Sequence, residues 1–250
     1  MIPIFKSNCS IGKSILTLDD PSKTKDGSAD SIISIAVENG LSQLFLVEDS
    51  MIGFIEAFTK CKENNIQLVF GLRISCCNDR MSEDKNLSHS KIVIFAKNDE
   101  GLKTLTKIYS LANTESQGFV DSSLLKKHWN SNVLMAIPFY DSFIYNNNFK
   151  GSLCVADFEF ANPILFVEGN DLPFDHILQA KVEKWAQINN SRIEKVKSIY
   201  YKDRKDFEAW QTYKCLCNRS FGKQQSLSSP NLEHCGSDSF CWEAFKENER

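Results

Sequence analysis

Acidic, basic and hydroxyl side chains gather where the apolar runs of this sequence end. Glu48-Asp49-Ser50 follows the run Leu44–Val47, and Glu168 to Asp171 follows Ile164–Val167. Adjacent carboxylates can act as a general base or bind a hard cation, and they can equally be neutralised by a nearby Lys or Arg. In parallel α/β folds the carboxyl ends of the strands meet at one edge, so these residues are the first candidates for a site.

Other residue types offer little catalytic chemistry. The sequence has no glycine-rich phosphate loop, no dinucleotide-binding motif and no nucleophile elbow, and Gly12-Lys13-Ser14 lacks the upstream glycine of a phosphate loop. No two of the four histidines share a metal-ligand spacing, so surface or helix-capping roles are expected for them. They are His89, His128, His176 and His234.

The nine cysteines are odd in number and scattered, which is typical of reduced thiols rather than of a disulfide framework. One alternative is a zinc site in the C-terminal part of the sequence. The single residue between Cys215 and Cys217 argues against it, because paired zinc ligands are normally two to four residues apart. The further ligands of such a site would be His234, Cys235 and Cys241.

The elements that must position the polar residues alternate along the chain. Short apolar runs predict strands, and longer stretches with apolar residues at helical spacing predict helices. Their order, strand after helix after strand, favours a parallel barrel or an open parallel sheet. The expected strands are 2–6, 44–47, 68–74, 92–96, 133–137, 164–167 and 196–199, the expected helices 30–39, 51–64, 100–113, 174–189 and 204–218, and the expected surface loops 78–90 and 221–229.

Composition narrows the function classes. The 250 residues fit a single large core, and 42% hydrophobic residues with 18 Phe exclude a disordered chain. A formal charge of −3 gives no basic excess, so strong autonomous nucleic-acid binding is not expected. No apolar run has the length of a membrane helix and no charged leader precedes one, so we expect a cytoplasmic protein. Its richness in Asn, Lys, Ile and Ser is compatible with an AT-rich genome, for example a viral one.

Three segments resemble a known family. Residues 46–58, continued by Cys61-Lys62 and Asn65–Gly71, resemble the PHP (polymerase and histidinol phosphatase) domain at the N-terminus of the bacterial DNA polymerase III alpha subunit. Phe95–Leu102 is similar to a Leu-Ala-Lys-Asn-Glu-Glu-Gly-Tyr block of that family, and Tyr200–Ala209 to a later block. The resemblance implies one PHP-like domain over residues 1–250, a distorted seven-stranded (β/α) barrel related to the TIM barrel, with no polymerase palm, fingers or thumb.

Active members of this family hold a trinuclear metal centre with His, Asp, Glu and Cys ligands, and the resemblance places most of those ligands on other residue types here. The opening pair of histidines falls on Ile4 and Lys6, and the next acidic ligand on Lys13. Asp49 is retained, but Ser50 stands where the family has His, and Arg73 where it has Glu. The next His and Cys fall on Lys91 and Phe139, and the closing Asp and His on Ser198 and Tyr200.

Four of these replacements are cationic and would repel divalent ions, so no metal and no other cofactor is expected. The resemblance then implies a non-catalytic accessory or docking protein in DNA replication, with a polymerase or a proofreading exonuclease as partner. One alternative is a metal-dependent phosphoesterase or 3′–5′ exonuclease that uses Asp49, Glu168, Asp171 and a histidine. Another is a polar or anion-binding pocket formed by Lys6, Glu48, Asp49, Arg73, Lys91 and Glu168.

Overall fold

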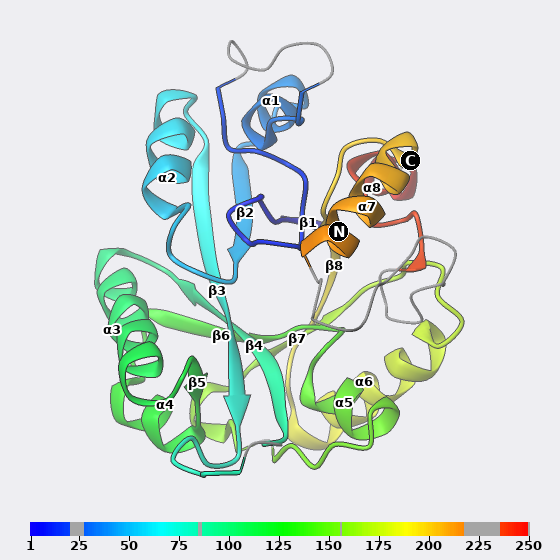
Figure 1. Cartoon of the computed structure of the whole chain (residues 1–250). Coiled ribbons are helices and arrows are strands. Elements are labelled where there is room, and N and C mark those ends of the chain that lie inside the picture. Colours follow the sequence, from blue (N-terminus) through cyan, green and yellow to red (C-terminus); the bar gives the residue numbers. More distant parts are fainter. Residues whose placement is uncertain (21–27, 85–86, 156, 218–235, 250) are drawn as a thin grey trace. The chain divides into compact units, whose positions relative to one another are not determined.

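The computed structural model describes residues 1–20, 28–84, 87–155, 157–217 and 236–249. Strands and helices alternate, as the sequence predicts (Figure 1). The strands are β1 Ile2–Phe5, β2 Gln43–Glu48, β3 Gln67–Cys77, β4 His89–Ala96, β5 Phe119–Val120, β6 Val133–Ile137, β7 Ile164–Val167 and β8 Ile193–Ile199. The helices are α1 Ile32–Glu38, α2 Phe54–Glu63, α3 Asp99–Glu115, α4 Ser122–His128, α5 Phe143–Phe149, α6 Asp175–Asn189, α7 Phe207–Cys217 and α8 Trp242–Asn248.

The sheet confirms the α/β class and the seven-stranded barrel. Its strand order is β2-β1-β8-β7-β6-β4-β3, and a pairing of β2 with β3 closes the order into a ring, with β5 added beside β3. The expectation of an all-parallel sheet is wrong, because β4 runs antiparallel to both β3 and β6. The polar stretch between β3 and β4 is too short for the helical crossover that a parallel neighbour needs.

The chain divides into two compact units. Unit 1 comprises 1–70, 169–173 and 196–250, and unit 2 comprises 71–168 and 174–195. The boundaries fall inside β3 and β8, so each of these strands contributes one part to each unit. A single domain over the whole chain stays a prediction.

Unit 1 is built on β1, β2 and the helices α1, α2, α7 and α8. Helix α1 begins after Ser31, whose side chain accepts a hydrogen bond from the Ser34 N–H, and its Ile and Ala side chains are buried. Helix α8 packs Trp242 against the ring of Phe5 on β1, with ring centroids 5.6 Å apart. The sequence pattern did not predict α8, which has only seven residues.

Unit 2 contains β4 to β7 and α3 to α6. Helix α3 begins after Asn98, whose side chain accepts a hydrogen bond from the Gly101 N–H at 2.9 Å. A Cβ on Gly101 would lie 2.1 Å from the carbonyl oxygen of Asn132, so only glycine fits there. Helix capping and this close approach thus explain why the block 95–102 has Asn at position 98 and Gly at position 101.

Three further elements, all in unit 2, were not predicted from the sequence. They are β5, α4 and α5, which have two to seven residues each. The predicted loop 221–229 lies outside the described residues. In the part of the chain that the structure describes, no helix has both the length and the apolar character needed to cross a bilayer.

Candidate functional site

The first group of candidate residues lies in unit 1, where β1 and β2 end. These strands are parallel, with Phe5 opposite Leu46, so the residues that follow them come close together. The Lys6 Nζ donates to Asp49 Oδ1 at 2.9 Å, and the exposed fractions of the two side chains are 5% and 28%. A cation therefore lies against Asp49, the acidic residue that the sequence resemblance assigns to a metal-ligand position.

Glu48 is fully buried beside this ion pair. Its carboxylate accepts hydrogen bonds from the Ser7 N–H at 2.8 Å and from the Ser10 hydroxyl. Burial raises the pKa of Glu48 above its ordinary value, although Lys6 and the two serines lower it in part. Because Glu48 fixes the loop that follows β1, its observed contacts are structural.

Five other sequence-predicted positions of unit 1 have separate contacts of their own. Ile4 is buried and pairs with Ser198 across the two strands. The Ser50 hydroxyl accepts from the Ile52 N–H at 3.4 Å, within a turn. Lys13 is exposed, and its main-chain carbonyl accepts from a tryptophan N–H of α7. Tyr200 also belongs to this set, and its ring stacks against those of Trp210 and Phe240, with centroids 5.7 and 5.6 Å away.

Unit 1 also holds a buried lysine on β8. Lys197 on β8 is 1% exposed, and its Nζ donates to the carbonyl oxygen of Gly169 at 2.9 Å. Asp171, a candidate of the phosphoesterase alternative, accepts from the Ser239 hydroxyl at 2.6 Å. Both contacts hold the segment 169–173 in place.

The second group lies in unit 2. The Arg73 guanidinium donates to Asp141 Oδ2 at 2.7 Å, and the two side chains are 12% and 18% exposed. Lys150 reaches the other oxygen of the same carboxylate at 3.1 Å. The sequence had suggested Glu48, Asp49 and Glu168 as partners for the cations and did not assign Asp141 to Arg73. Asp141 lies four residues after the end of the 133–137 strand, and this nearness to a strand end was the available signal.

The other unit 2 candidates have different surroundings. Lys91 lies opposite Ser75 across β3 and β4, and its Nζ donates to the Ser75 hydroxyl at 2.6 Å. Phe139 is fully buried, with its ring 4.9 Å from that of Tyr140. Glu168 is buried directly after β7. A single pocket formed by both groups stays a prediction, because the structure defines the contacts within each unit.

Soft and anionic metal donors are dispersed within the described residues. Neither unit, in the ranges given above, places three or more His, Cys, Asp or Glu side chains where they could share an ion. His89 begins β4, His128 ends α4 and His176 lies in α6. The side chains that are present do not fit the metal centre implied by the resemblance.

The residues of the zinc alternative are distributed: Cys215 and Cys217 lie in α7, Cys241 begins α8, and the other two lie outside the described residues. Buried Cys241 caps α8, with its sulfur accepting from the Ala244 N–H at 3.4 Å. Cys217 is exposed at the end of α7. His234 and Cys235 are outside the described residues.

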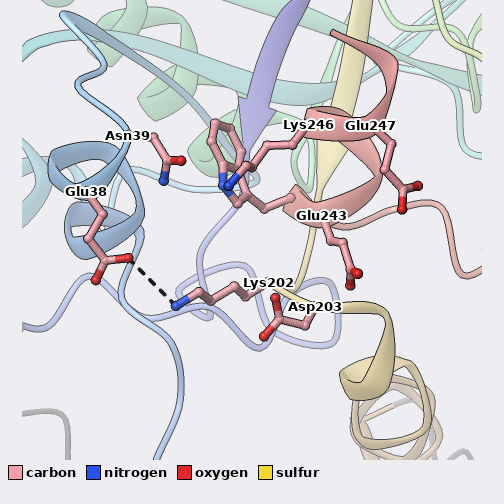
Figure 2. Close-up of a pocket in the computed structure, with 8 residues that line it drawn as sticks. Glu38, Asn39, Lys202, Asp203, Glu243, Lys246 and Glu247 are labelled. Atoms are coloured by element: carbon pink, nitrogen blue, oxygen red, sulfur yellow. Dashed lines mark ion pairs between the residues drawn. The ribbon is translucent and has the colours of Figure 1, made fainter. Parts of the chain in front are cut away.

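Unit 1 also carries a hollow of about 470 Å³ lined by residues of α1, the segment after β8, and α8 (Figure 2). Glu38 forms an ion pair with Lys202 at 3.9 Å, drawn as a dashed line in Figure 2. Glu247 pairs with the Arg204 guanidinium at 2.8 Å, and Glu243 accepts from the Arg204 N–H. These three carboxylates of the hollow are thus paired with cations or N–H groups of the same unit.

Comparison with known proteins identifies one family. Residues 24–208 match the family model of the PHP domain, which is well over half of the chain. The match includes all of unit 2 and begins after Lys6 and Lys13. A search of curated proteins gave no match.

Proposed function

Since the chain belongs to the PHP domain family, which is of phosphoesterase type, we propose that it is a member without metal-dependent chemistry. In this proposal the protein acts as a non-catalytic accessory or docking protein in DNA replication. The barrel is kept as a scaffold, and its surface binds a polymerase or a proofreading exonuclease.

The ion pair between Lys6 and Asp49 is the main observation in favour of a protein without metal-dependent chemistry. A Lys6 ammonium 2.9 Å from this carboxylate competes with a metal ion for the same oxygens. Lys6 is also nearly buried, so water screens its charge poorly and repulsion of a divalent ion is strong. An ammonium of this kind offers no lone pair to a metal, whereas a histidine would.

The role in replication is supported by the sequence resemblance to the polymerase III alpha subunit. The segments that carry it are structural in this fold. Residues 46–58 contain the end of β2 and the start of α2, and Phe95–Leu102 contains the end of β4 and the cap of α3. These segments build the barrel and its helices, and a scaffold of this kind is the part that a docking protein needs.

The experiment begins with elemental analysis of the purified protein and a phosphodiesterase assay with bis(p-nitrophenyl) phosphate and added Mn²⁺, Zn²⁺ or Fe²⁺. We expect no stoichiometric metal and no hydrolysis above that of the Asp49→Asn variant. Two or three ions per chain, together with hydrolysis that Asp49→Asn abolishes, would overturn the proposal and support the phosphoesterase alternative. Hydrolysis that survives in Asp49→Asn would indicate a contaminating enzyme.

Docking is tested separately by size-exclusion chromatography with the replicative polymerase and the proofreading exonuclease of the same host. The expected result is a complex with one of them that withstands moderate salt. If neither partner changes the elution of this protein at micromolar concentration, the docking role is wrong, whatever the result of the metal analysis.

A further inference from the structure

A hollow of about 450 Å³ lies in unit 2 between α3, α4 and the residue Arg80 that follows β3. Helix α3 contributes Lys107, Leu111 and Glu115, spaced four residues apart and hence on one face. The floor is apolar, since Leu124 of α4 is 3% exposed. The hollow belongs to neither of the side-chain groups described above.

Paired and unpaired lysines alternate on the two helices. On α3, Lys103 pairs with Glu100 at 2.7 Å, and on α4, Lys126 pairs with Asp157 at 2.7 Å. Neither of these two lysines is among the residues that line the hollow. Lys107 and Lys127 do line the hollow, and within the described part of the chain neither ammonium has an ion pair or hydrogen bond.

His128 lies beside the two unpaired lysines. Partial burial lowers the pKa of His128, and the positive charges of Lys107 and Lys127 lower it further, whereas Glu115 opposes them. The hollow is therefore electropositive at the place where His128 lies. A bound anion would reverse this effect and favour the imidazolium.

Glu115, the acidic residue that lines the hollow, forms an ion pair with Arg80. Glu115 accepts from the Arg80 guanidinium at 2.9 Å, and Asp121 lies 3.7 Å from the Arg80 Nε. Arg80 is thus balanced by two carboxylates, which leaves the lysine charges uncompensated. The cationic groups come from two different helices and converge on one hollow with an apolar floor.

We propose that this hollow binds the phosphate group of a small phosphomonoester, with Lys107, Lys127 and His128 as the anion ligands and Leu111 and Leu124 beneath the ligand's apolar part. Its size suits a mononucleotide or a ligand of similar size. The lysines supply charge and His128 supplies a directed N–H donor in its protonated form. This site does not depend on the docking role proposed above.

The test follows the four histidine ring signals by NMR while pH is varied, with and without inorganic phosphate, sulfate and AMP. We expect each anion to raise the pKa of His128 and leave the other histidines unchanged. Sulfate keeps its two charges across the pH range of histidine titration, so with sulfate the affinity should increase as pH falls through the pKa of His128. AMP should bind more tightly than phosphate, because only AMP contacts the leucines.

The matched variants are Lys107→Gln/Lys127→Gln and, as the control, Lys103→Gln/Lys126→Gln. Both doubles remove two exposed lysines from the same two helices, so both should fold and change net charge equally. The first should lose roughly tenfold in AMP affinity, and the control should bind as the wild type does. Equal loss in both doubles, or a pKa of His128 that no anion changes, overturns the proposal. Tighter binding of a single-stranded oligonucleotide than of AMP would overturn the assignment to a small ligand.

Discussion

Replacement of Arg73 by Met should destabilise the fold, because it removes the ion-pair partner of Asp141. Arg73 donates to Asp141 at 2.7 Å between side chains that are 12% and 18% exposed. Methionine keeps most of the aliphatic volume but removes the charge. Lys150 still lies beside Asp141, but its side chain is 46% exposed, so water screens its attraction.

The magnitude lies between two limits. Breaking a fully buried ion pair costs about 3–5 kcal/mol, and an exposed pair is worth about 0.2–1 kcal/mol. The Arg73–Asp141 pair is mostly buried and keeps a second cation, so we expect a loss of about 1–3 kcal/mol in the free energy of unfolding.

The assay is urea unfolding at neutral pH of the wild type, Arg73→Met, Asp141→Asn and the double variant. Asparagine is the right substitution because residue 141 has a φ of +58°, a left-handed conformation that Asn tolerates. We expect a coupling energy of about 1–2 kcal/mol from the double-mutant cycle. Additive effects within about 0.3 kcal/mol would refute the reasoning, since they would show that the two charges do not stabilise each other.

Three further changes test separate parts of the structure. Burial raises the pKa of Glu48 above 4.5, so the wild type loses stability as pH rises and this carboxyl ionises. In urea titrations, the free energy of unfolding of Glu48→Gln relative to the wild type should therefore increase between pH 4.5 and neutral. A relative free energy that decreases over this range would contradict the prediction. Gly101→Ala should cost about 3 kcal/mol or more, as its Cβ would lie 2.1 Å from a carbonyl oxygen, whereas Gly169→Ala, with open space around it, should change the melting temperature little. Burial raises the pKa of the Cys61 thiol to about 11, so mass spectrometry after iodoacetamide treatment at mildly alkaline pH should find exposed Cys217 labelled first and Cys61 protected until unfolding.

The buried strands could be predicted closely from the sequence, because a strand covered on both faces is a continuous apolar run. β6 and β7 have the predicted bounds for this reason. The apolar run of β4 does not itself indicate direction, since it is the same for parallel and antiparallel neighbours; the short polar stretch between β3 and β4 was the sequence signal for an antiparallel pair. Helices of seven residues are at the limit of such patterns: α1 was predicted, whereas α4, α5 and α8 were not.

Strand direction also decides which part of the candidate site could be predicted from the sequence. Lys6 and Asp49 follow two parallel strands, and parallel neighbours bring their carboxyl ends to one edge, so strand ends alone indicated that these residues could meet. Arg73 lies inside β3, which continues to Cys77 and is paired there with antiparallel β4. The rule of strand ends does not apply to a residue inside an antiparallel pair. Its partner Asp141 depends on a left-handed turn after β6, which a pattern of apolar residues does not encode. A site whose charges lie within antiparallel strands therefore requires the structure before its ion pairs can be assigned.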